Sequence, residues 1–343
     1  MSKYNVAVVG AGAVGEEMLN VLAQRDFPVN ELKVLARSAR EIIVNGRSYA
    51  VRKTEPEEFD GVDFALFAGT ENASATYAWE AAKHGAVVID NSATFRMDPK
   101  VPLVVPECNP DDVDWHQGVI ANPNCSTIQM VVALKPLHMR SRITRIVVST
   151  YQAVSGTGRD AIEELDQQSN LLVHGRKVKG GPTYPYQIAF NLLPHIGSFR
   201  DDGYTSEEWK MIEETHKILG DPDIKVTPTT VRVPVFNAHS ESVYIETEEK
   251  ITANEARELL GKAPGVVVVD ENVPGKDPKF RTYPMPIDAS GQDATYVGRV
   301  REDPFIPTGL SMWVVSDNLR KGAALNAVQI AELLIQKGLV TGN

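Results

Sequence analysis

Apolar residues in the first third of the chain occur in short continuous runs, each flanked by polar or glycine-rich segments. The runs cover residues 5–9, 33–36, 64–68, 87–90 and 119–121. Runs of this length are typical of strands that are buried on both faces. An apolar face at helical spacing (Val14, Met18, Val21 and Leu22) follows the first run, and a second helical pattern covers residues 74–84. The alternation predicts right-handed βαβ units around a parallel sheet, which is a Rossmann-type α/β domain.

The pattern changes after residue 127. Two helices begin with capping boxes, Thr205-x-x-Glu208 and Thr252-x-x-Glu255. The predicted strands of this half cover residues 143–151, 227–234, 241–247 and 265–270. We therefore expect a second domain of the α+β class with a mixed or antiparallel sheet. Domains of this kind often carry substrate groups and a subunit interface.

The last segment, residues 322–338, places Leu325, Val328, Ala331 and Leu334 on one helical face. It predicts an amphipathic helix, and we expect this helix to pack back against the first domain. The chain thus divides into residues 1–126, 127–317 and 318–343.

Composition narrows the possible functions. The 343 residues are 43 % hydrophobic and 23 % charged, which suits two globular domains. A formal net charge of −10 argues against a nucleic-acid or anionic-membrane partner. Two cysteines suit a reducing compartment, and no apolar run is long enough to span a membrane. Because the N-terminus runs straight into a strand, we expect no signal peptide and a cytoplasmic location.

A glycine-rich turn follows the first strand and opens the first helix. Its pattern, Gly10-x-Gly12-x-x-Gly15, gives a tight turn and lets the backbone approach a pyrophosphate. The helix N-terminus offers N–H groups and a positive dipole end to the phosphates. The turn predicts dinucleotide contacts from Gly10, Gly12, Ala13, Val14 and Gly15.

The end of the second predicted strand indicates which nicotinamide is bound. An NAD enzyme usually has Asp or Glu here for the ribose 2′-hydroxyl, but this chain has Arg37, Ser38 and Arg40. Guanidinium groups beside a hydroxyl suit a 2′-phosphate, so we predict NADP with contacts from Arg37 and Ser38. The alternative is that these arginines are ordinary solvated surface residues.

Cys125 is the candidate nucleophile. It stands between the strand 119–121 and an apolar helix predicted over 127–137, with Asn124 beside it. A sulfur at a helix N-terminus has its thiolate stabilised by the helix dipole, and ligands bind at strand ends in parallel sheets. The alternative is a buried cysteine that acts as a small hydrophobe. Cys108 has no such setting and is predicted to be structural.

A catalytic thiol needs a proton-transfer partner, which is usually a histidine. Of the seven histidines, His239 has the most suggestive setting, because a predicted strand carrying Arg232 leads to a turn that presents it. The other six are expected to be surface or packing residues. The chain has no metal-ligand spacing such as HExxH or CxxC, so no metal site is predicted.

Four segments resemble the signatures of the aspartate-β-semialdehyde dehydrogenase family. They are residues 122–127, residues 149–156, Arg232 with His239-Ser240-Glu241-Ser242, and residues 317–326. They occur in the family's order and extend over nearly the whole chain. The resemblance implies a dinucleotide-binding domain at 1–126, a catalytic and dimerisation domain at 127–317, and a homodimer or homotetramer.

The resemblance also implies a reaction, the NADPH-dependent reductive dephosphorylation of L-4-aspartyl phosphate to L-aspartate 4-semialdehyde plus phosphate. This step feeds lysine, threonine, methionine and diaminopimelate synthesis. In this reading Cys125 forms an acyl-thioester, His239 is the general acid/base, and Gln152 orients the acyl group beside the sulfur.

The remaining roles are implied in the same way. Arg232 and Glu207 would hold the carboxylate and ammonium of the substrate, together with Gln152. Phosphate would be bound by three residues, Arg96, Asn124 and Lys210. Ser155, Gly156 and Asn318 would touch the cofactor near its nicotinamide. Taken without the resemblance, Glu207 and Lys210 would be an ordinary i,i+3 surface pair.

One departure concerns the cofactor turn, where the family usually has one more residue and a threonine. Two other readings remain open. A related acyl-phosphate or acyl-thioester reductase, of the N-acetyl-glutamyl-phosphate type, would keep Cys125 and His239 without needing the Arg232–Glu207 pair. A non-catalytic relative acting as a binding protein would be expected to lose the cysteine, the histidine or the phosphate cluster, and this chain keeps all three.

Overall fold

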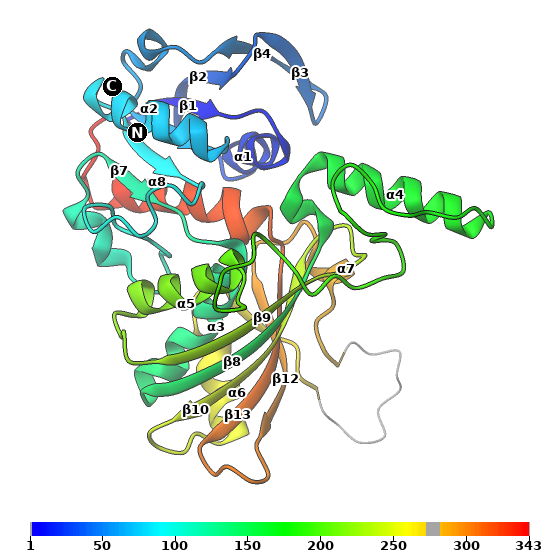
Figure 1. Ribbon diagram of the computed structural model, residues 1–343. Coiled ribbons are helices and arrows are strands. Elements are labelled where there is room, and N and C mark those ends of the chain that lie inside the picture. The colour runs from blue at the N-terminus through cyan, green and yellow to red at the C-terminus, as the bar shows by residue number, and fades with distance from the viewer. Residues whose placement is uncertain (1, 272–281, 343) are drawn as a thin grey trace. The chain divides into compact units, whose positions relative to one another are not determined.

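The computed structural model describes residues 2–271 and 282–342, which form two compact units (Figure 1). Unit 1 comprises Met1–Asn124 with Gly322–Asn343, and unit 2 comprises Cys125–Lys321. The chain thus divides after Asn124 and after Lys321, whereas the sequence suggested boundaries after residues 126 and 317. No helix in the described part of the chain has the length and hydrophobicity needed to cross a membrane.

Unit 1 is built on a seven-stranded sheet in the order β3-β4-β2-β1-β5-β6-β7. The strands are β1 Tyr4–Val9, β2 Val29–Ala36, β3 Arg40–Val44, β4 Arg47–Lys53, β5 Phe64–Phe67, β6 Val87–Asp90 and β7 Val119–Ala121. All neighbouring pairs are parallel except β3 with β4. The predicted Rossmann-type parallel sheet is confirmed. The β3–β4 hairpin was not predicted, although Asn45 and Gly46, both at positive φ, are a typical hairpin turn.

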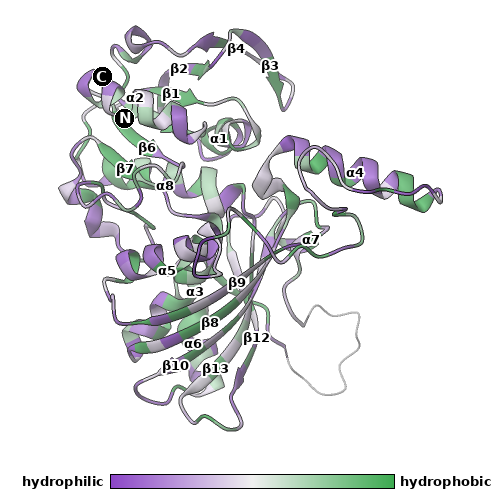
Figure 2. Ribbon diagram, viewed as in Figure 1, coloured by the Kyte–Doolittle hydropathy of each residue, from purple (hydrophilic) through white to green (hydrophobic). Residues whose placement is uncertain are grey.

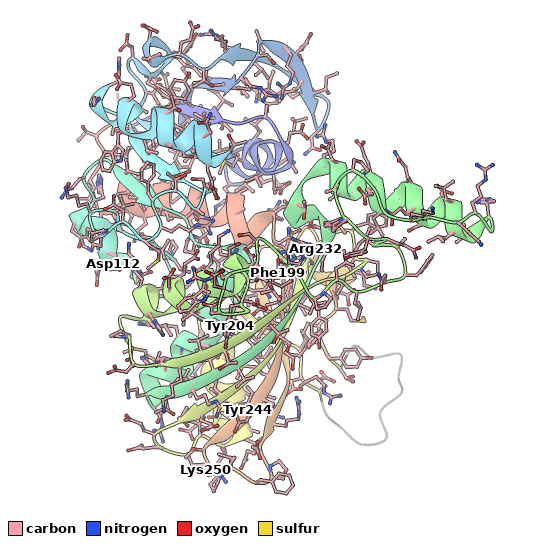
Figure 3. The ribbon with its side chains drawn as sticks, in the orientation of Figure 1. Asp112, Phe199, Tyr204, Arg232, Tyr244 and Lys250 are labelled. Atoms are coloured by element: carbon pink, nitrogen blue, oxygen red, sulfur yellow. The ribbon has the colours of Figure 1, made fainter. Side chains whose placement is uncertain are left out.

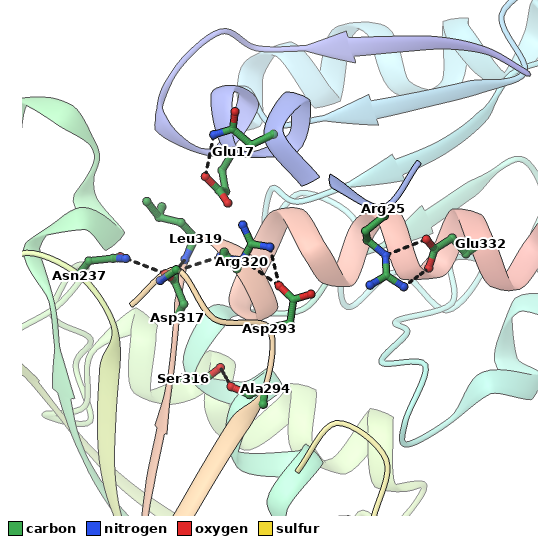
Figure 4. Close-up of polar contacts among 12 residues, drawn as sticks. Glu17, Arg25, Asn237, Asp293, Ala294, Ser316, Asp317, Leu319, Arg320 and Glu332 are labelled. Atoms are coloured by element: carbon green, nitrogen blue, oxygen red, sulfur yellow. Dashed lines mark hydrogen bonds and ion pairs between the residues drawn. The ribbon is translucent and has the colours of Figure 1, made fainter. Parts of the chain in front are cut away.

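Three helices pack on this sheet: α1 Ala13–Gln24, α2 Glu71–Lys83 and α8 Leu325–Gln336. A π-helical turn, Arg320–Ala324, precedes α8. The apolar face of α8, including Leu325, Val328, Ala331 and Leu334, is buried in one core cluster with Val6 and Val8 of β1. Arg25 of α1 and Glu332 of α8 form a two-bond ion pair, with N–O distances of 2.7 Å (Figure 4). The C-terminal helix is therefore part of the dinucleotide-domain core.

Unit 2 is built on a six-stranded sheet in the order β11-β12-β13-β10-β8-β9. The strands are β8 Ile143–Gln152, β9 Lys225–Arg232, β10 His239–Thr247, β11 Val266–Val268, β12 Thr295–Glu302 and β13 Gly309–Ser316. β8 pairs with β9 in parallel, and β10 is antiparallel to both β8 and β13. The sheet is mixed, as expected. Hydrophobic residues concentrate on strands of both sheets, as β1 and β13 show in Figure 2.

The helices of unit 2 are α3 Cys125–Arg140, α4 Arg159–Val173, α5 Ser206–Leu219, α6 Ala253–Lys262 and α7 Pro286–Ala289. α3 packs against β8, β10, β12 and β13, while α5 packs against α3 and β9. The predicted capping box of α5 is complete, because Thr205 and Glu208 bond each other's backbone N–H. This fixes the first turn of α5, which carries Glu207 and Lys210.

Candidate active site

Three of the predicted catalytic and substrate-binding residues meet at the ends of neighbouring strands in the unit 2 sheet. The parallel strands β8 and β9 end at Gln152 and Arg232, which are direct register partners. The antiparallel strand β10 begins at His239, beside the end of β8. Since residues opposite each other in neighbouring strands share a face, all three side chains lie on the same face of the sheet. All three are also buried.

The ring of His239 is fully buried and is held by the backbone. Its Nδ1 accepts a hydrogen bond from the Ala153 N–H at 3.0 Å, so the proton of the neutral ring resides on Nε2. Nε2 itself has no hydrogen-bond partner among the described residues. Burial, and then the charge of Arg232, lower the pKa of His239 well below its ordinary value. The ring is therefore neutral near pH 7 and offers one N–H.

The predicted turn at His239 is wrong in one respect. The turn ends at Ala238, and His239 is the first residue of β10. Ala238 has a left-handed backbone with φ of 70°, which is uncommon for a residue with a side chain. Its N–H donates to Asn318 Oδ1 at 3.0 Å. The strained residue and its hydrogen bond together set the position at which β10, and with it His239, begins.

The guanidinium group of Arg232 is hydrogen-bonded through one of its nitrogens and has an unused donor on another. Its Nη1 donates to the Ala153 carbonyl at 2.7 Å, while its buried Nε has no partner among the described residues. The residue borders a cavity of about 470 Å³ that is also lined by Tyr184, His195 and Phe199. Figure 3 shows Arg232 beside Phe199. A guanidinium with an unused donor beside a cavity suits a bound carboxylate.

Gly156 packs directly on Arg232 and His239. A Cβ built on it would lie 3.0 Å from Arg232 Nη1 and 3.1 Å from His239 Nε2. The sequence assigned Gly156 to the cofactor, and the contacts add a steric reason for glycine that the sequence could not supply. Any larger residue would push against the predicted substrate-binding Arg232 and the predicted catalytic His239.

We expect Gly156→Ala to slow turnover on the order of tenfold, since a shift of 1 Å at a reacting group costs about 10²-fold and this clash is a few tenths of an ångström. Steady-state kinetics measures the effect. Gly261→Ala in α6 is the control, because a Cβ there meets nothing within 4 Å. Parent kinetics in Gly156→Ala would show that the two side chains tolerate the shift.

Two other predicted cofactor residues, Ser155 and Asn318, contact each other. Asn318 Nδ2 donates to Ser155 Oγ at 3.0 Å. Asp317 extends this network, because its Oδ2 accepts from Asn237 Nδ2 at 2.7 Å and its Oδ1 accepts from the Leu319 N–H (Figure 4). Asn237 and Asp317 were not predicted, although both lie within or beside the segments that carry the family resemblance. They join the loop before His239 to the loop that carries Asn318.

Cys125 is the first residue of α3 and is half-buried, whereas the helix was predicted to start at residue 127. The first turn of α3 contains no acidic residue, so nothing in it opposes a thiolate. Cys108 is buried and, like Cys125, is a thiol. The sulfur of Cys125 therefore lies at the N-terminus of the helix that packs on β8 and β10.

Glu207 and Lys210 form the predicted i,i+3 pair on α5, with Nζ 3.5 Å from the carboxylate. The pair is not an ordinary surface pair, since the Glu207 side chain is 9 % exposed. α5 packs against β9, the strand that ends at Arg232. A buried carboxylate therefore lies on a helix next to the strand of the predicted carboxylate-binding arginine.

In unit 1 the glycine turn has the geometry of a phosphate cradle. Gly10 has φ of 116°, and a Cβ there would lie 2.7 Å from the Ala68 carbonyl carbon. A Cβ on Gly15 would collide with the Gly10 carbonyl, whereas above Gly12 the space is open. No side chain caps α1, which starts directly after Gly12. Gly10 and Gly15 are closely packed, whereas the space beside Gly12 is open and the N–H groups at the start of α1 have no side-chain cap. This combination suits a bound pyrophosphate.

The predicted 2′-phosphate residues lie on the surface beside this turn. Arg37 and Ser38 are exposed in the bend between β2 and β3. Arg40 Nη2 donates to the Ala11 carbonyl of the glycine turn at 3.1 Å. The sequence predicted contacts from Arg37 and Ser38, whereas the structure shows that Arg40 contacts the turn.

The predicted phosphate residues Arg96 and Asn124 lie near the end of β7. Arg96 is buried, and its Nε and Nη2 donate to the carbonyls of Asn122 and Asn91 at 2.9 and 2.8 Å. Asn326 Nδ2 in turn donates to Asn122 Oδ1 at 2.7 Å. This network fixes the segment that leads into Asn124 and the thiol.

Comparisons with known proteins identify the two domains and the family. Family models match residues 5–116 as the semialdehyde dehydrogenase NAD binding domain and residues 134–321 as the semialdehyde dehydrogenase dimerisation domain. An aspartate-semialdehyde dehydrogenase of Aquifex aeolicus is 54 % identical over 98 % of this chain and 99 % of its own length. One from Bacillus subtilis is 48 % identical, with the same coverage.

Solved structures give the same result. Aspartate semialdehyde dehydrogenase II of Vibrio cholerae matches with a TM-score of 0.92 and 47 % identity, covering 97 % of this chain and 99 % of the other. A second structure of that enzyme, complexed with ASA, matches with a TM-score of 0.92, 46 % identity and coverage of 98 % and 99 %. Full-length similarity at this level, together with the two domain matches, shows that the chain belongs to the aspartate-semialdehyde dehydrogenase family.

Proposed function

We propose that this chain is an aspartate-semialdehyde dehydrogenase that catalyses the reductive dephosphorylation of L-4-aspartyl phosphate to L-aspartate 4-semialdehyde plus phosphate. The observation that carries the proposal is the convergence of Gln152, Arg232 and His239 at the ends of three neighbouring strands, two of which, β8 and β10, pack against the helix that begins at Cys125. The enzyme uses a nicotinamide dinucleotide, bound in unit 1, and acts in amino-acid biosynthesis.

In the proposed mechanism Cys125 Sγ attacks the acyl carbon of the substrate, the C–O bond to phosphate breaks, and a thioester forms. A nicotinamide held near Ser155, Gly156 and Asn318 would supply the hydride that the acyl carbon accepts. The resulting thiohemiacetal collapses, the C–S bond breaks and the aldehyde leaves while the sulfur is regenerated. Gln152, the last residue of β8, orients the acyl group.

His239 serves as the proton-transfer group. In its neutral form the Nε2–H is available to donate a hydrogen bond to sulfur or to the substrate oxygen. A full general-acid cycle needs the ring to take up a proton as well. Because Nε2 already carries a proton, this uptake occurs at Nδ1 and breaks the hydrogen bond from the Ala153 N–H.

Arg232 holds the substrate carboxylate, and Glu207 holds its ammonium group. Arg96, Asn124 and Lys210 bind the phosphate, and their cations supply the local positive charge that an acidic chain needs for anionic substrates. The buried state of Glu207 and the unused Nε of Arg232 support these roles.

Arg232→Lys tests the carboxylate site. We expect kcat/KM for aspartate semialdehyde to fall on the order of 10²-fold, because an ammonium cannot reproduce a bidentate guanidinium contact, and lost hydrogen bonds to charged groups are worth about 1.5–3 kcal/mol. Arg52→Lys, at an exposed ion pair with Glu58, is the control. A parent value in Arg232→Lys would place the substrate carboxylate elsewhere.

For the cofactor we propose NADP, with Gly10, Gly12, Ala13, Val14 and Gly15 at the pyrophosphate. Arg37 and Ser38 bind the 2′-phosphate. Arg40, two residues after Ser38, donates a hydrogen bond to the Ala11 carbonyl of the glycine turn. Ser155, Gly156 and Asn318 approach the nicotinamide. The absence of an acidic residue at the end of β2 supports NADP over NAD.

The match to a dimerisation domain supports an oligomeric protein, and we propose that it is a homodimer or homotetramer. The face of the unit 2 sheet opposite α3 supports this, since half-exposed Ser242 and Trp313 line a cavity of about 400 Å³ there with Arg299. We also propose a cytoplasmic location, which two thiol cysteines suit.

The deciding experiment is a steady-state assay with aspartate semialdehyde, phosphate and either NADP or NAD. We expect phosphate-dependent reduction of NADP. Activity with N-acetyl-glutamate semialdehyde in place of aspartate semialdehyde would favour the related reductase instead. Equal efficiency with NAD would remove the role given to Arg37 and Ser38.

A further inference from the structure

Two buried polar side chains lie one layer beneath the proposed catalytic groups, and the proposed mechanism uses neither. Glu241 is 0 % exposed and follows His239 by two residues on β10. Gln129 is 1 % exposed and follows Cys125 by one turn on α3. Positions i and i+2 of a strand share a face, as do positions i and i+4 of a helix. Both pairs belong to unit 2, where α3 packs against β10.

Burial favours the protonated form of Glu241. Its cross-strand neighbours are Thr150 on β8 and Val314 on β13, neither of which is charged. From α3 it is faced by the amide of Gln129, and the nearest titratable group on its own strand is the neutral His239. Burial raises the pKa of Glu241 well above its ordinary value, and the Gln129 amide lowers it by less. In its protonated form Glu241 has an O–H to donate.

The two side chains lack any other partner. Neither carboxyl oxygen of Glu241 and neither amide atom of Gln129 meets hydrogen-bond geometry with a described group. Orphaned buried polar atoms are rare, because each retains its full desolvation cost. A carboxylic acid and a primary amide are complementary, since the O–H donates to the amide oxygen and an amide N–H donates to the carboxyl oxygen. Pairing them satisfies all four atoms.

We propose that Gln129 and Glu241 form a hydrogen-bonded positioning pair that fixes the helix carrying Cys125 against the strand carrying His239. The inference rests on the proposed function. Apolar packing is non-directional, whereas hydrogen bonds fix distance and angle. The pair therefore sets where the first turn of α3 lies relative to the imidazole, which must be within hydrogen-bond reach of the nucleophile.

Four variants test the pair. Glu241→Leu and Gln129→Leu each leave one partner orphaned, and we expect kcat to fall on the order of 10²-fold, the effect of about 1 Å of misplacement, with KM little changed. The double variant Gln129→Leu/Glu241→Leu leaves no orphan, so it keeps a parent-like Tm but stays slow. Glu241→Gln, which can still pair with the amide, keeps the parent kcat.

The control is Val243→Ala, the next residue along the same face of β10, which is 1 % exposed. It lowers Tm through a cavity without lowering kcat. Parent kcat in Glu241→Leu, or in the double variant, would overturn the proposal. A kcat of Glu241→Gln as low as that of Glu241→Leu would also overturn the proposal, because the carboxylic acid would then have a role that a hydrogen-bonding amide cannot replace. If the single leucine variants fail to fold, the kcat values of the double variant and of Glu241→Gln still test the proposal.

A second readout follows from the proton on Glu241. The unfolded state releases this proton above about pH 4.5, while the folded state keeps it, so the contribution of Glu241 to stability falls as pH rises. Glutamine carries no such proton. The Tm of Glu241→Gln minus that of the parent should therefore increase from pH 5 to pH 8. The opposite contribution of His239 is common to both proteins and cancels. A flat difference would show an ionised Glu241 and overturn the proposal.

Alkylation of the thiol separates this inference from the proposed function. The rate at which iodoacetamide modifies the Cys125 peptide, followed by mass spectrometry, should fall in Glu241→Leu and not in Glu241→Gln. If Cys125→Ala remains active, the proposed function fails. If Cys125→Ala is inactive while Glu241→Leu has parent turnover and alkylation, only the positioning pair fails.

Discussion

Cys125→Ala is expected to lower turnover on the order of 10⁴- to 10⁶-fold, because no other group in the proposed mechanism can form the covalent thioester. Cys125 is the first residue of α3, and its truncation removes the sulfur without changing the helix that follows. The measurement is phosphate-dependent reduction of NADP with aspartate semialdehyde. Cofactor binding, followed by fluorescence titration of NADPH, should be retained, since the glycine turn lies in unit 1.

Cys108→Ala is the matched control for Cys125→Ala. Cys108 is also a thiol, but it is 5 % exposed and lies in unit 1. Its truncation should cost stability and leave turnover near the parent value. Substantial residual activity in Cys125→Ala would remove the central claim of the proposed mechanism.

His239→Ala is expected to lower kcat by about 10²- to 10⁴-fold, the usual contribution of a positioned proton-transfer group. The variant removes the Nε2–H and leaves the Ala153 N–H without its acceptor. His84→Ala, at a surface ion pair with Asp60, is the control and should be silent. An unchanged rate in His239→Ala would mean that a different group transfers the proton.

The pH profile gives an independent check on His239. Burial and the charge of Arg232 lower its pKa well below the ordinary 6.5, so the ring stays neutral as pH falls through that value. The acid limb of kcat/KM that reports this histidine should therefore lie below pH 6.5. A limb at or above pH 6.5 would show that the imidazole is more exposed to solvent than the structure has it.

Much of unit 1 could be predicted from the sequence, because buried parallel strands are continuous apolar runs. β6 and β7 begin and end where the runs predicted, and the glycine turn lies between β1 and α1. The β3–β4 hairpin at the sheet edge was missed, since its residues are largely exposed and its apolar run is limited to Ile42, Ile43 and Val44. In unit 2, α4, β12 and β13 were not predicted, so the order of the mixed sheet was not predicted either.

Part of the candidate site could likewise be predicted from the sequence and part could not. The sequence identified Cys125, Gln152, Arg232 and His239, because each lies in a segment with a family pattern. It could not identify the loop network of Asn237 and Asp317, or the polar layer of Gln129 and Glu241. These residues gain their roles from partners that are far away along the chain.

What the sequence by itself determined was which residue types carry the chemistry, the family, and the alternation that gives a dinucleotide domain. The tertiary structure decided the state of those residues. In the folded chain His239 is buried and its Nδ1 accepts a hydrogen bond from the Ala153 N–H, while Gly156 packs on the imidazole ring and on Arg232. The reason is physical: a pKa, a tautomer or a steric limit depends on desolvation and on neighbours from other strands, and neither is a property of the local sequence.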